Sequence, residues 1–556
     1  MPTSNSLNDG QPPLSDERAR LTGAAQVLAG MTALSRASGL VRDVVIGATF
    51  GTGAGADAFF AAFRLPNLFR RIAAEGAASA AFVPVFTSAL LRSGTAGAAQ
   101  AAAAVGGVTI VSLAVLSAIG MAAAEPLTDL LAPGFAADPE KRALTVSLTR
   151  WLFPYLLLVG TAAWAMGVLH TFRNFAVPAW GPVLLNASII ACAWLLRPAL
   201  SPPEYALVIG VLLGGSLQVA VQVPWLLRIG LRPRMFLDIA DAAVRRTGPL
   251  LVAAVFGGAV YQLNVLVATL LASLLPAGSV SFLWYADRLF EFPLGIVAVA
   301  VGTAALPTMA ALAREERRRE LAATVVHSLS LTLAWCLPAA LGLLLLAPDI
   351  VELLLQRGRF TAHDTVMTAW ALQAQAPGLI GVAAARVLSG AFYALDRPRV
   401  PVLAAALAVV ANAIMALALM GPPEPSAPAV AHWIGAAGAA VRIADLRHAG
   451  LALATAVAAS INAAILLVML RVRLRELSLR AVLGPIVVHA GAAAVMAATV
   501  AAVRSALAAP GGEGAAVRVA AAMTAGVATY VAAAWAMGSA QIRETVGLAL
   551  DWIRRR

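Results

Sequence analysis

Five arginines lie between residues 35 and 75, in a stretch whose flanks are apolar enough to enter a lipid bilayer. They are Arg36, Arg42, Arg64, Arg70 and Arg71. An arginine near the bilayer centre costs about 2.5–3.5 kcal/mol, so five facing lipid would cost about 12–18 kcal/mol. That sum is comparable to the whole stability of a typical domain. The side chains must therefore face protein or a water-filled cavity, and a cavity lined by arginines indicates an anionic ligand. The planar guanidinium suits phosphate, which it can bind through two parallel hydrogen bonds.

The same stretch contains three acids, Asp43, Asp57 and Glu75, so some of the charges could form internal ion pairs. Arg71 and Glu75 have the i,i+4 spacing of a helical pair. The arginines still outnumber the acids, and the excess predicts an external anion. Arg70 and Arg71 lie about 100° apart on a helix. An ideal helical wheel favours Arg71 as the residue that faces the cavity. A bend at Pro66 would change the direction of the following residues, so the choice between Arg70 and Arg71 stays open.

A second charged segment, YADRLFEFPLG, begins at residue 285 within an otherwise apolar span. Asp287, Arg288 and Glu291 precede Pro293, and Arg288 and Glu291 have the i,i+3 spacing of a helical ion pair. Proline and glycine loosen a membrane helix locally. The segment is therefore the predicted counterpart of the 35–75 stretch.

The composition indicates a polytopic membrane protein. The 556 residues are 60% hydrophobic and 12% charged, whereas soluble domains contain about 25% charged residues. The net charge of +12 comes almost entirely from arginine, since Lys141 is the only lysine. The two cysteines give neither a disulfide framework nor a zinc motif. No Walker A, HExxH or GxSxG pattern with partners is present, so we expect a transporter and not an enzyme, with no cofactor and no metal site.

A spanning helix needs about 20 mostly apolar residues, and fourteen segments meet this requirement. They are 24–50, 57–91, 101–132, 146–170, 178–196, 205–227, 247–275, 280–313, 322–347, 365–395, 400–420, 449–470, 481–508 and 517–540. Arginine-rich connections, such as REERRR at 314–319, alternate with connections that contain few positive charges. By the positive-inside rule both termini are expected to be cytosolic.

Three prolines recur after 223 residues: Pro84, Pro154 and Pro178 correspond to Pro307, Pro377 and Pro401. A repeat of six helices, an even number, gives two copies that point the same way. We therefore expect an all-α fold of two parallel six-helix lobes around a central cationic cavity, plus two extra C-terminal helices. The expected divisions are a disordered cytosolic tail (1–22), an N-terminal lobe (23–246), a C-terminal lobe (247–471), and the last two helices with a cytosolic tail (472–556).

Polar residues elsewhere in the spans are expected to serve structure. Asn186, Asn264, Asn412 and Asn462 are interpreted as interhelical hydrogen-bonding amides, with an ion site as the less favoured alternative. The segment 421–448, rich in proline, alanine and glycine, is expected to be a flexible loop.

The sequence closely resembles the MurJ (MviN) family of lipid II flippases over about residues 24–480. The resemblance rests on SRASGLVRD, on GADAFFAAFRLPNLFRRIAAEGAASAAFVP and on GSVSFLWYADRLFEFPLGIVAVAVGTAALP, in that order. It implies fourteen helices, the last two forming a groove for a lipid tail. It also implies transport of the undecaprenyl-pyrophosphate-linked peptidoglycan precursor, lipid II, from the inner to the outer leaflet by alternating access.

The resemblance further implies roles for individual residues. The substrate-binding residues would be Arg36, Arg42, Arg70 and Arg288, so the family favours Arg70 over Arg71. Asp57 would lie at the outer gate, and Glu75 and Glu291 would be supporting acids. The full supporting or gating set is Asp43, Asp57, Arg64, Asn67, Arg71, Glu75, Asp287 and Glu291. Some family members bind sodium, but the ligands cannot be matched here, so no ion site is assigned.

We therefore expect a lipid II flippase of the bacterial cytoplasmic membrane. Its partners would be lipid II and membrane lipids, with no nucleic acid, and we expect a monomer. Coupling to the membrane potential or to a cation stays open. The alternatives are an exporter of another lipid-linked oligosaccharide and a drug/cation antiporter of the same superfamily. An antiporter would favour acidic cavity residues, and the arginine excess argues against it. A membrane glycosyltransferase would need a large outer loop with paired carboxylates, and the expected outer loops are short.

Overall fold

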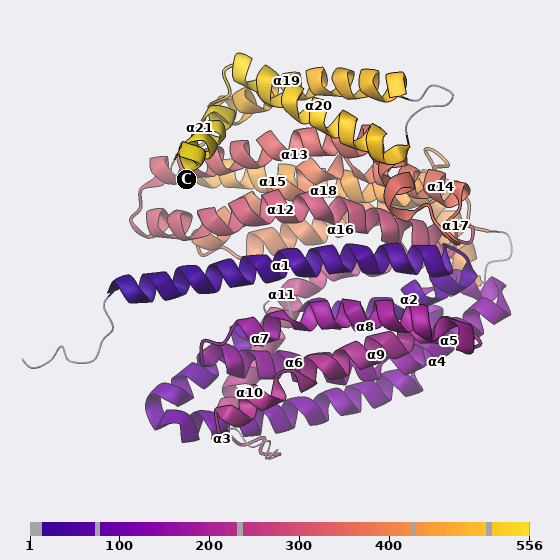
Figure 1. Ribbon diagram of the computed structural model, residues 1–556, viewed down its shortest axis with the longest axis vertical. Helices are drawn as coiled ribbons and strands as arrows, with labels where there is room; N and C mark the ends of the chain where they lie inside the picture. Colours follow the sequence, from indigo (N-terminus) through magenta and orange to yellow (C-terminus); the bar gives the residue numbers. More distant parts are fainter. Residues whose placement is uncertain (1–13, 73–77, 231–236, 425–428, 508–513, 555–556) are drawn as a thin grey trace, which may run out of the picture. The chain divides into compact units, whose positions relative to one another are not determined.

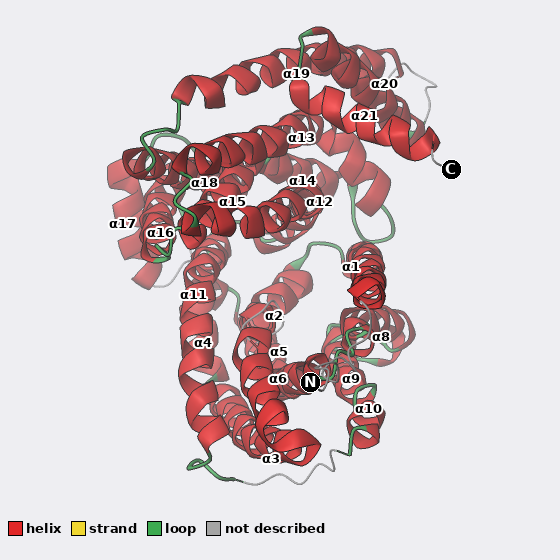
Figure 2. Ribbon diagram, turned by 90° about the vertical axis from the view of Figure 1, so that its left-hand side faces the viewer, coloured by secondary structure: helices red, strands yellow, loops and turns green. Residues whose placement is uncertain are grey.

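The structure is a computed structural model of the chain, and its description covers residues 14–72, 78–230, 237–424, 429–507 and 514–554. Within these residues every regular element is a helix (Figure 2), and the only β-type pairing is an isolated bridge between Met420 and Asp445. The expected all-α class is confirmed. Ten helical segments are long and apolar enough to cross a membrane, or eleven if one bent pair is a single span. This search covers only the described residues, so the count of fourteen stays a prediction.

The chain divides into two compact units, each assembled from separate stretches of sequence. Unit 1 comprises Met1–Val45, Leu65–Ala122 and Arg150–Phe256, and unit 2 comprises Ile46–Arg64, Ala123–Thr149 and Gly257–Arg556. The sequence predicted a division near residue 246, which lies within a helix, ten residues before the end of unit 1. The sequence did not predict that residues 46–64 and 123–149 pack with unit 2.

Four helices contribute to both units: α1 (Leu14–Phe50), α2 (Ala54–Ile72), α5 (Pro139–Leu152) and α11 (Ala242–Ser273). The other helices of unit 1 are α3 (Ala78–Ala122), α6 (Pro154–Thr171), α7 (Ala176–Ala179), α8 (Gly181–Leu195), α9 (Tyr205–Ala220) and α10 (Val223–Arg228). α3 packs on α6 around buried Phe82, Phe86 and Trp164. α8 and α9 approach closely at Gly214 of α9, because a side chain there would clash with the backbone of Leu185 in α8. Small residues commonly allow such close contacts between membrane helices.

Unit 2 contains a bundle in which α12, α13, α15 and α18 lie side by side (Figure 1). Its elements are α4 (Ala124–Leu131), the 3-10 turn η2 (Pro133–Ala137), α12 (Ser279–Arg314), α13 (Arg318–Leu355), α14 (Ala362–Gln375), α15 (Gly378–Ala394), α16 (Arg399–Leu419), α17 (Ala429–Val441), α18 (Arg447–Arg473), α19 (Leu479–Leu507), α20 (Ala515–Ala536) and α21 (Ala540–Arg554). The hairpin of α19 and α20 runs along α13 (Figure 1). Leu346, Met496 and Tyr530 are buried in that interface.

Three local expectations differ from the structure. α1 begins at Leu14, so the tail that was predicted to reach residue 22 is helical in its last part. The span predicted at 101–132 ends at Ala122 in α3, which is kinked at Gly94, where φ is 64°. The segment 421–448 contains the helix α17, because its run of alanines favours a helix between the flanking prolines and glycines.

One of the three proline pairs, Pro154 and Pro377, lies at comparable breaks between two consecutive helices. Pro154 is the first residue of α6, directly after α5, and Pro377 is the N-cap of α15, directly after α14. α14 and α15 are bent by 43° at this point. Pro84 and Pro307 both lie inside long helices, α3 and α12. These positions support the internal duplication inferred from the sequence.

Candidate functional site

In unit 1, Arg42 of α1 is held by a neighbouring acid and by an amide of α8. Its Nε and Nη2 donate to the Asp43 carboxylate at 2.7–3.0 Å, and its Nη1 donates to Asn186 Oδ1 at 3.1 Å. Asp43 is buried, with 3% of its side chain exposed. Asn186 also donates to Ser38 Oγ at 2.9 Å, which fixes the amide between the two helices. The interhelical role predicted for Asn186 is confirmed. Asn412 of α16 donates a hydrogen bond of 2.7 Å to Asn264 of α11, so the predicted interhelical role of these two amides is confirmed as well.

Arg36 and Arg70 are the other two arginines of unit 1 that the sequence predicted to bind substrate. Arg36 is half-buried and makes no hydrogen bond or ion pair with any described residue. Arg70 Nε donates to Asn67 Oδ1 at 2.9 Å, one turn earlier on α2. The side chain of Arg71 and the whole of Glu75 lie outside the described residues, so their predicted roles stay predictions.

In unit 2, Asp57 of α2 is a buried carboxylate that accepts four hydrogen bonds. Lys141 Nζ of α5 donates at 2.9 Å, the backbone N–H of Gly278 at 2.8 Å, and the backbone N–H and hydroxyl of Ser281 at 2.9 and 2.6 Å. Gly278 is the N-cap of α12 and Ser281 its third residue. Asp57 thus satisfies the two N–H groups that a capping box satisfies, but from another helix. The carboxylate also lies at the positive end of the α12 dipole.

This network explains why the segments 46–64 and 123–149 belong to unit 2. Asp57 and Lys141 bring the beginnings of α2 and α5 to the beginning of α12. The Lys141 ammonium also lies 4.0 Å from the ring centroid of Phe135 in η2. Both charged side chains are buried, with 8% of Lys141 and 2% of Asp57 exposed. Sequence reasoning singled out Asp57 but not Lys141, although its being the only lysine could have drawn attention to it.

About two turns further along α2 and α12, two arginines meet at a single indole. The guanidinium carbons of Arg64 and Arg288 lie 4.7 and 4.6 Å from the ring centroid of Trp284. Arg288 Nη1 also donates to Glu291 Oε2 at 2.8 Å, which confirms the predicted i,i+3 pair. Asp287 accepts a hydrogen bond of 2.8 Å from Gln375 of α14. Sequence reasoning missed Trp284, whose only sequence signal is its position four residues before Arg288.

A further charged cluster joins α13 to the α19–α20 hairpin. Asp349 pairs with Arg504 of α19 at 2.6 Å and with Arg518 of α20 at 2.9 Å. Arg518 also pairs with Glu352 at 2.7 Å. Asp349 is buried, with 6% of its side chain exposed. The sequence indicated this cluster only through Arg504 and Arg518, which lie among apolar residues of α19 and α20. It balances its own charges, so we interpret it as a structural attachment of the hairpin.

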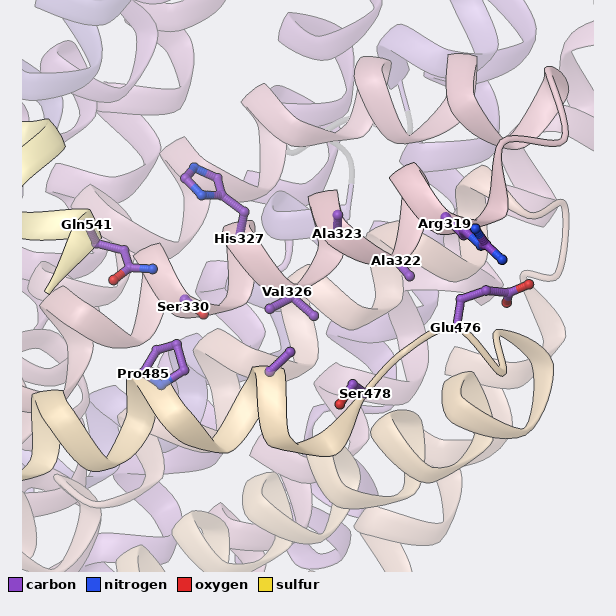
Figure 3. A pocket seen from close by; sticks show the side chains of 11 residues that line it. Arg319, Ala322, Ala323, Val326, His327, Ser330, Glu476, Ser478, Pro485 and Gln541 are labelled. Atoms are coloured by element: carbon purple, nitrogen blue, oxygen red, sulfur yellow. The ribbon is translucent and has the colours of Figure 1, made fainter.

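A cavity of about 390 Å³ lies between α13, α19 and α21. Arg319 and Glu476 lie at one end of it and Gln541 at the other, with His327 and Ser330 between them (Figure 3). Its described wall contains none of the residues predicted to bind substrate. The charges of Arg319 and Glu476 oppose each other in this wall, and most of the other lining residues are apolar.

The apolar helices and the arginines in their interior define a class of protein, a polytopic membrane protein. The structure superposes on one titled "Lipid II flippase MurJ, inward closed conformation" with a TM-score of 0.73 and 21% identity, covering 93% of this chain and 99% of that one. It also superposes on an inward-facing multidrug resistance MATE family transporter of the MOP superfamily with a TM-score of 0.62 and 14% identity, covering 80% and 95%. At these identities the likeness shows the fold alone.

Sequence comparison identifies the family within that class. The family model described as "Lipid II flippase MurJ" matches residues 46–521. The lipid II flippase MurJ of Burkholderia cenocepacia is 37% identical over 383 residues, covering 68% of this chain and 74% of that protein. A probable lipid II flippase MurJ of Vibrio cholerae is 35% identical over 403 residues, covering 71% and 77%. The chain belongs to the MurJ family.

Proposed function

We propose that this protein is a lipid II flippase that moves the undecaprenyl-pyrophosphate-linked peptidoglycan precursor from the inner to the outer leaflet. The observation that carries the proposal is the family match over residues 46–521. It extends across both units and includes most of the arginine-bearing stretch. The protein is an integral membrane protein by its apolar helices. We place it in the bacterial cytoplasmic membrane with both termini cytosolic, because the arginine-rich connections alternate along the chain.

Four arginines that the family resemblance singles out serve as the pyrophosphate-binding groups in this proposal. Arg36 supports it most directly, because its half-buried guanidinium has no acidic partner among the described residues. Arg42 is already paired with Asp43, so a phosphate oxygen must share or replace one of its contacts. Arg70 and Arg288 complete the set. Each is held on one side by a hydrogen bond, to Asn67 and to Glu291 respectively. A guanidinium has five N–H donors, so donors remain for substrate after one or two are used.

Asp57 serves as the outer latch. Alternating access requires the substrate groups to face one side of the membrane at a time. Asp57 and Lys141 hold the first residues of α2, α5 and α12 together through buried, mutually satisfied contacts. By the inferred topology these helix ends lie at the outer surface. Opening toward that surface then requires at least part of this network to separate.

A drug/cation antiporter, the principal alternative, has less support. The likeness to multidrug transporters lies in the fold at 14% identity. The buried Arg64 and the half-buried Arg42 and Arg288 suit an anionic substrate better than a cationic one. No observation favours the antiporter over the flippase. We expect a monomer, without a cofactor, driven by the membrane potential, a cation or the consumption of its substrate.

Reconstitution tests this function directly. Proteoliposomes containing the full chain and fluorescent lipid II are treated with a membrane-impermeant quencher, and the quenched fraction is followed with time. The proposal predicts that the wild-type chain makes inner-leaflet lipid II accessible, whereas R36Q and R288Q slow this by at least about tenfold, since one charge-assisted hydrogen bond is worth about 1.5–3 kcal/mol. R92Q, at an exposed arginine of α3, is the matched control and should flip normally. Equal quenching in liposomes with and without the protein contradicts the proposal.

A further inference from the structure

α17 carries apolar side chains that are exposed on the surface of unit 2. Its sequence, AVAHWIGAAGAAV, contains one titratable residue, His432. Trp433 is 81% exposed, and just beyond the helix Ile443 is 74% exposed. An exposed apolar surface of this kind marks a site that binds a protein or a membrane.

The covered side of α17 is formed by two glycines. A Cβ atom at Gly435 would lie 3.1 Å from the ring of Pro423, and one at Gly438 would lie 3.5 Å from the backbone oxygen of Leu417. The glycine side of α17 therefore lies against the last turn of α16 and the residues that follow it. Figure 2 shows the two helices beside each other.

The opposite side of α17 is a stripe of three residues, Trp433, Ala437 and Ala440. Their i, i+4, i+7 spacing places them on one face of the helix. All three are exposed, whereas Gly438 is buried. This stripe, the Trp433 face, is the part of α17 that needs an apolar partner.

The backbone fixes α17 at the level where a membrane span ends. α16 and α18 are both long and apolar enough to cross a membrane. The N–H groups of Ile443 and Leu446 donate to the carbonyls of Ala418 and Leu419 at 2.9 Å each, so the chain after α17 is bonded to the last turn of α16. α17 has 13 residues, too few for a span that needs about 20. An apolar helix of this length between the ends of two spans suits the bilayer surface.

Charged side chains follow α17 directly. Arg442, Asp445 and Arg447 are exposed, and two arginines against one acid leave an excess of positive charge. Arginine binds phosphate through charge-assisted hydrogen bonds, and tryptophan is enriched at the headgroup level of bilayers. An apolar helix with an exposed indole and adjacent cations therefore matches the headgroup region of a phospholipid bilayer.

We propose that α17 lies in the bilayer interface, with the Trp433 face toward the acyl chains and Arg442 at the phosphates. The partner is the phospholipid surface, which by the inferred topology is that of the outer leaflet. This surface is separate from the arginines assigned to lipid II, so the inference goes beyond the proposed function. α17 then anchors the joined ends of α16 and α18 at the membrane surface.

The test uses spin labels on the full chain in phosphatidylcholine nanodiscs. Single cysteines (W433C, A437C or A440C) carry the label in a chain whose two buried cysteines are changed to serine (C192S, C336S). Electron paramagnetic resonance compares collisions with oxygen, which enters the acyl region, and with a nickel chelate, which stays in water. Oxygen should dominate at all three positions, at a depth of about 5–10 Å into the headgroup–acyl boundary. E424C, at an exposed residue of the connection before α17, is the matched control, and nickel should dominate there.

A second measurement leaves the two buried cysteines unchanged. In nanodiscs of acyl-brominated phosphatidylcholine, wild type should lose more tryptophan emission than W433F, because the bromines reach Trp433. Dominance of nickel at 433 and 437, or equal quenching of the two chains, overturns the inference, because α17 would then lie in water. Exclusion of both reagents from 433, 437 and 440 also overturns it, since a protein, such as a second copy of the chain, then covers the Trp433 face.

Discussion

The buried pair of Asp57 and Lys141 offers the sharpest test of how the beginnings of α2, α5 and α12 are joined. Lys141→Met removes the ammonium and keeps the length of the side chain. Breaking a buried ion pair by removing one partner costs about 3–5 kcal/mol. Asp57 keeps three donors from Gly278 and Ser281 in this variant, so the loss should fall at the lower end, about 3 kcal/mol.

Asp57→Ala should cost more than Lys141→Met. It leaves the Lys141 ammonium buried without its carboxylate, and it removes the acceptor of two backbone N–H groups in the first turn of α12. We expect about 5 kcal/mol, the upper end of the range. The double variant should be little worse than D57A alone, because the two residues contribute through one shared contact.

The assay is a denaturant titration of the full chain in detergent micelles, followed by circular dichroism. Arg142→Met is the matched control. Arg142 follows Lys141 directly, but its pairs with Glu125 and Asp129 are exposed, so its loss should cost less than about 1 kcal/mol. The reasoning is wrong if K141M costs no more than R142M. It is also wrong if the D57A and K141M losses add to within about 0.5 kcal/mol in the double variant.

Three further predictions follow from the other charged groups. R36Q should slow lipid II flipping with little change in thermal stability. R42Q should lower both the flipping rate and the thermal stability, because it removes the guanidinium that pairs with the buried Asp43 carboxylate. Flipping and thermal unfolding, measured on the same preparation, distinguish these two outcomes. R518M should lower the free energy of unfolding by about 1–3 kcal/mol by freeing the α20 end from α13, which the same denaturant titration measures. The hydrogen bond and charge of Arg142 hold the pKa of Asp129 below its ordinary value of 3.8. The stability that this pair contributes is therefore fully present above pH 3.8 and is lost as the pH falls through the lower pKa of the folded state. R142M should raise the pH midpoint of acid unfolding, which circular dichroism measures. The pair is exposed, so the free energy involved is under about 1 kcal/mol.

Sequence reasoning identified the features that depend on composition and helical spacing. The cost of burying arginine singled out the 35–75 stretch without any structure. The i,i+3 spacing predicted the contact between Arg288 and Glu291, and the in-membrane position of Asn186 predicted an interhelical hydrogen bond. Each of these follows from periodicity or from the absence of water, which a sequence displays directly.

The missed features depend on side-chain direction and on contacts distant in sequence. Arg42 binds Asp43, its immediate neighbour, which a helical wheel does not place on the same face. Asp57 caps a helix that begins more than 200 residues later. The meeting of Arg64 and Arg288 at Trp284 requires the register of α2 against α12, and no spacing along one helix supplies it.

The central claim is that this chain moves lipid II across the membrane by means of its buried arginines. The most direct measurement is made in a bacterium whose own lipid II flippase can be shut off and replaced by this chain. An impermeant reagent that acts only on outer-leaflet lipid II reports the accessible fraction. We predict that the wild-type chain and R92Q restore accessibility, and that R36Q and R288Q, present at equal levels in the membrane, do not. The claim is contradicted if lipid II stays inaccessible with the wild-type chain present, or if both charge variants restore accessibility fully.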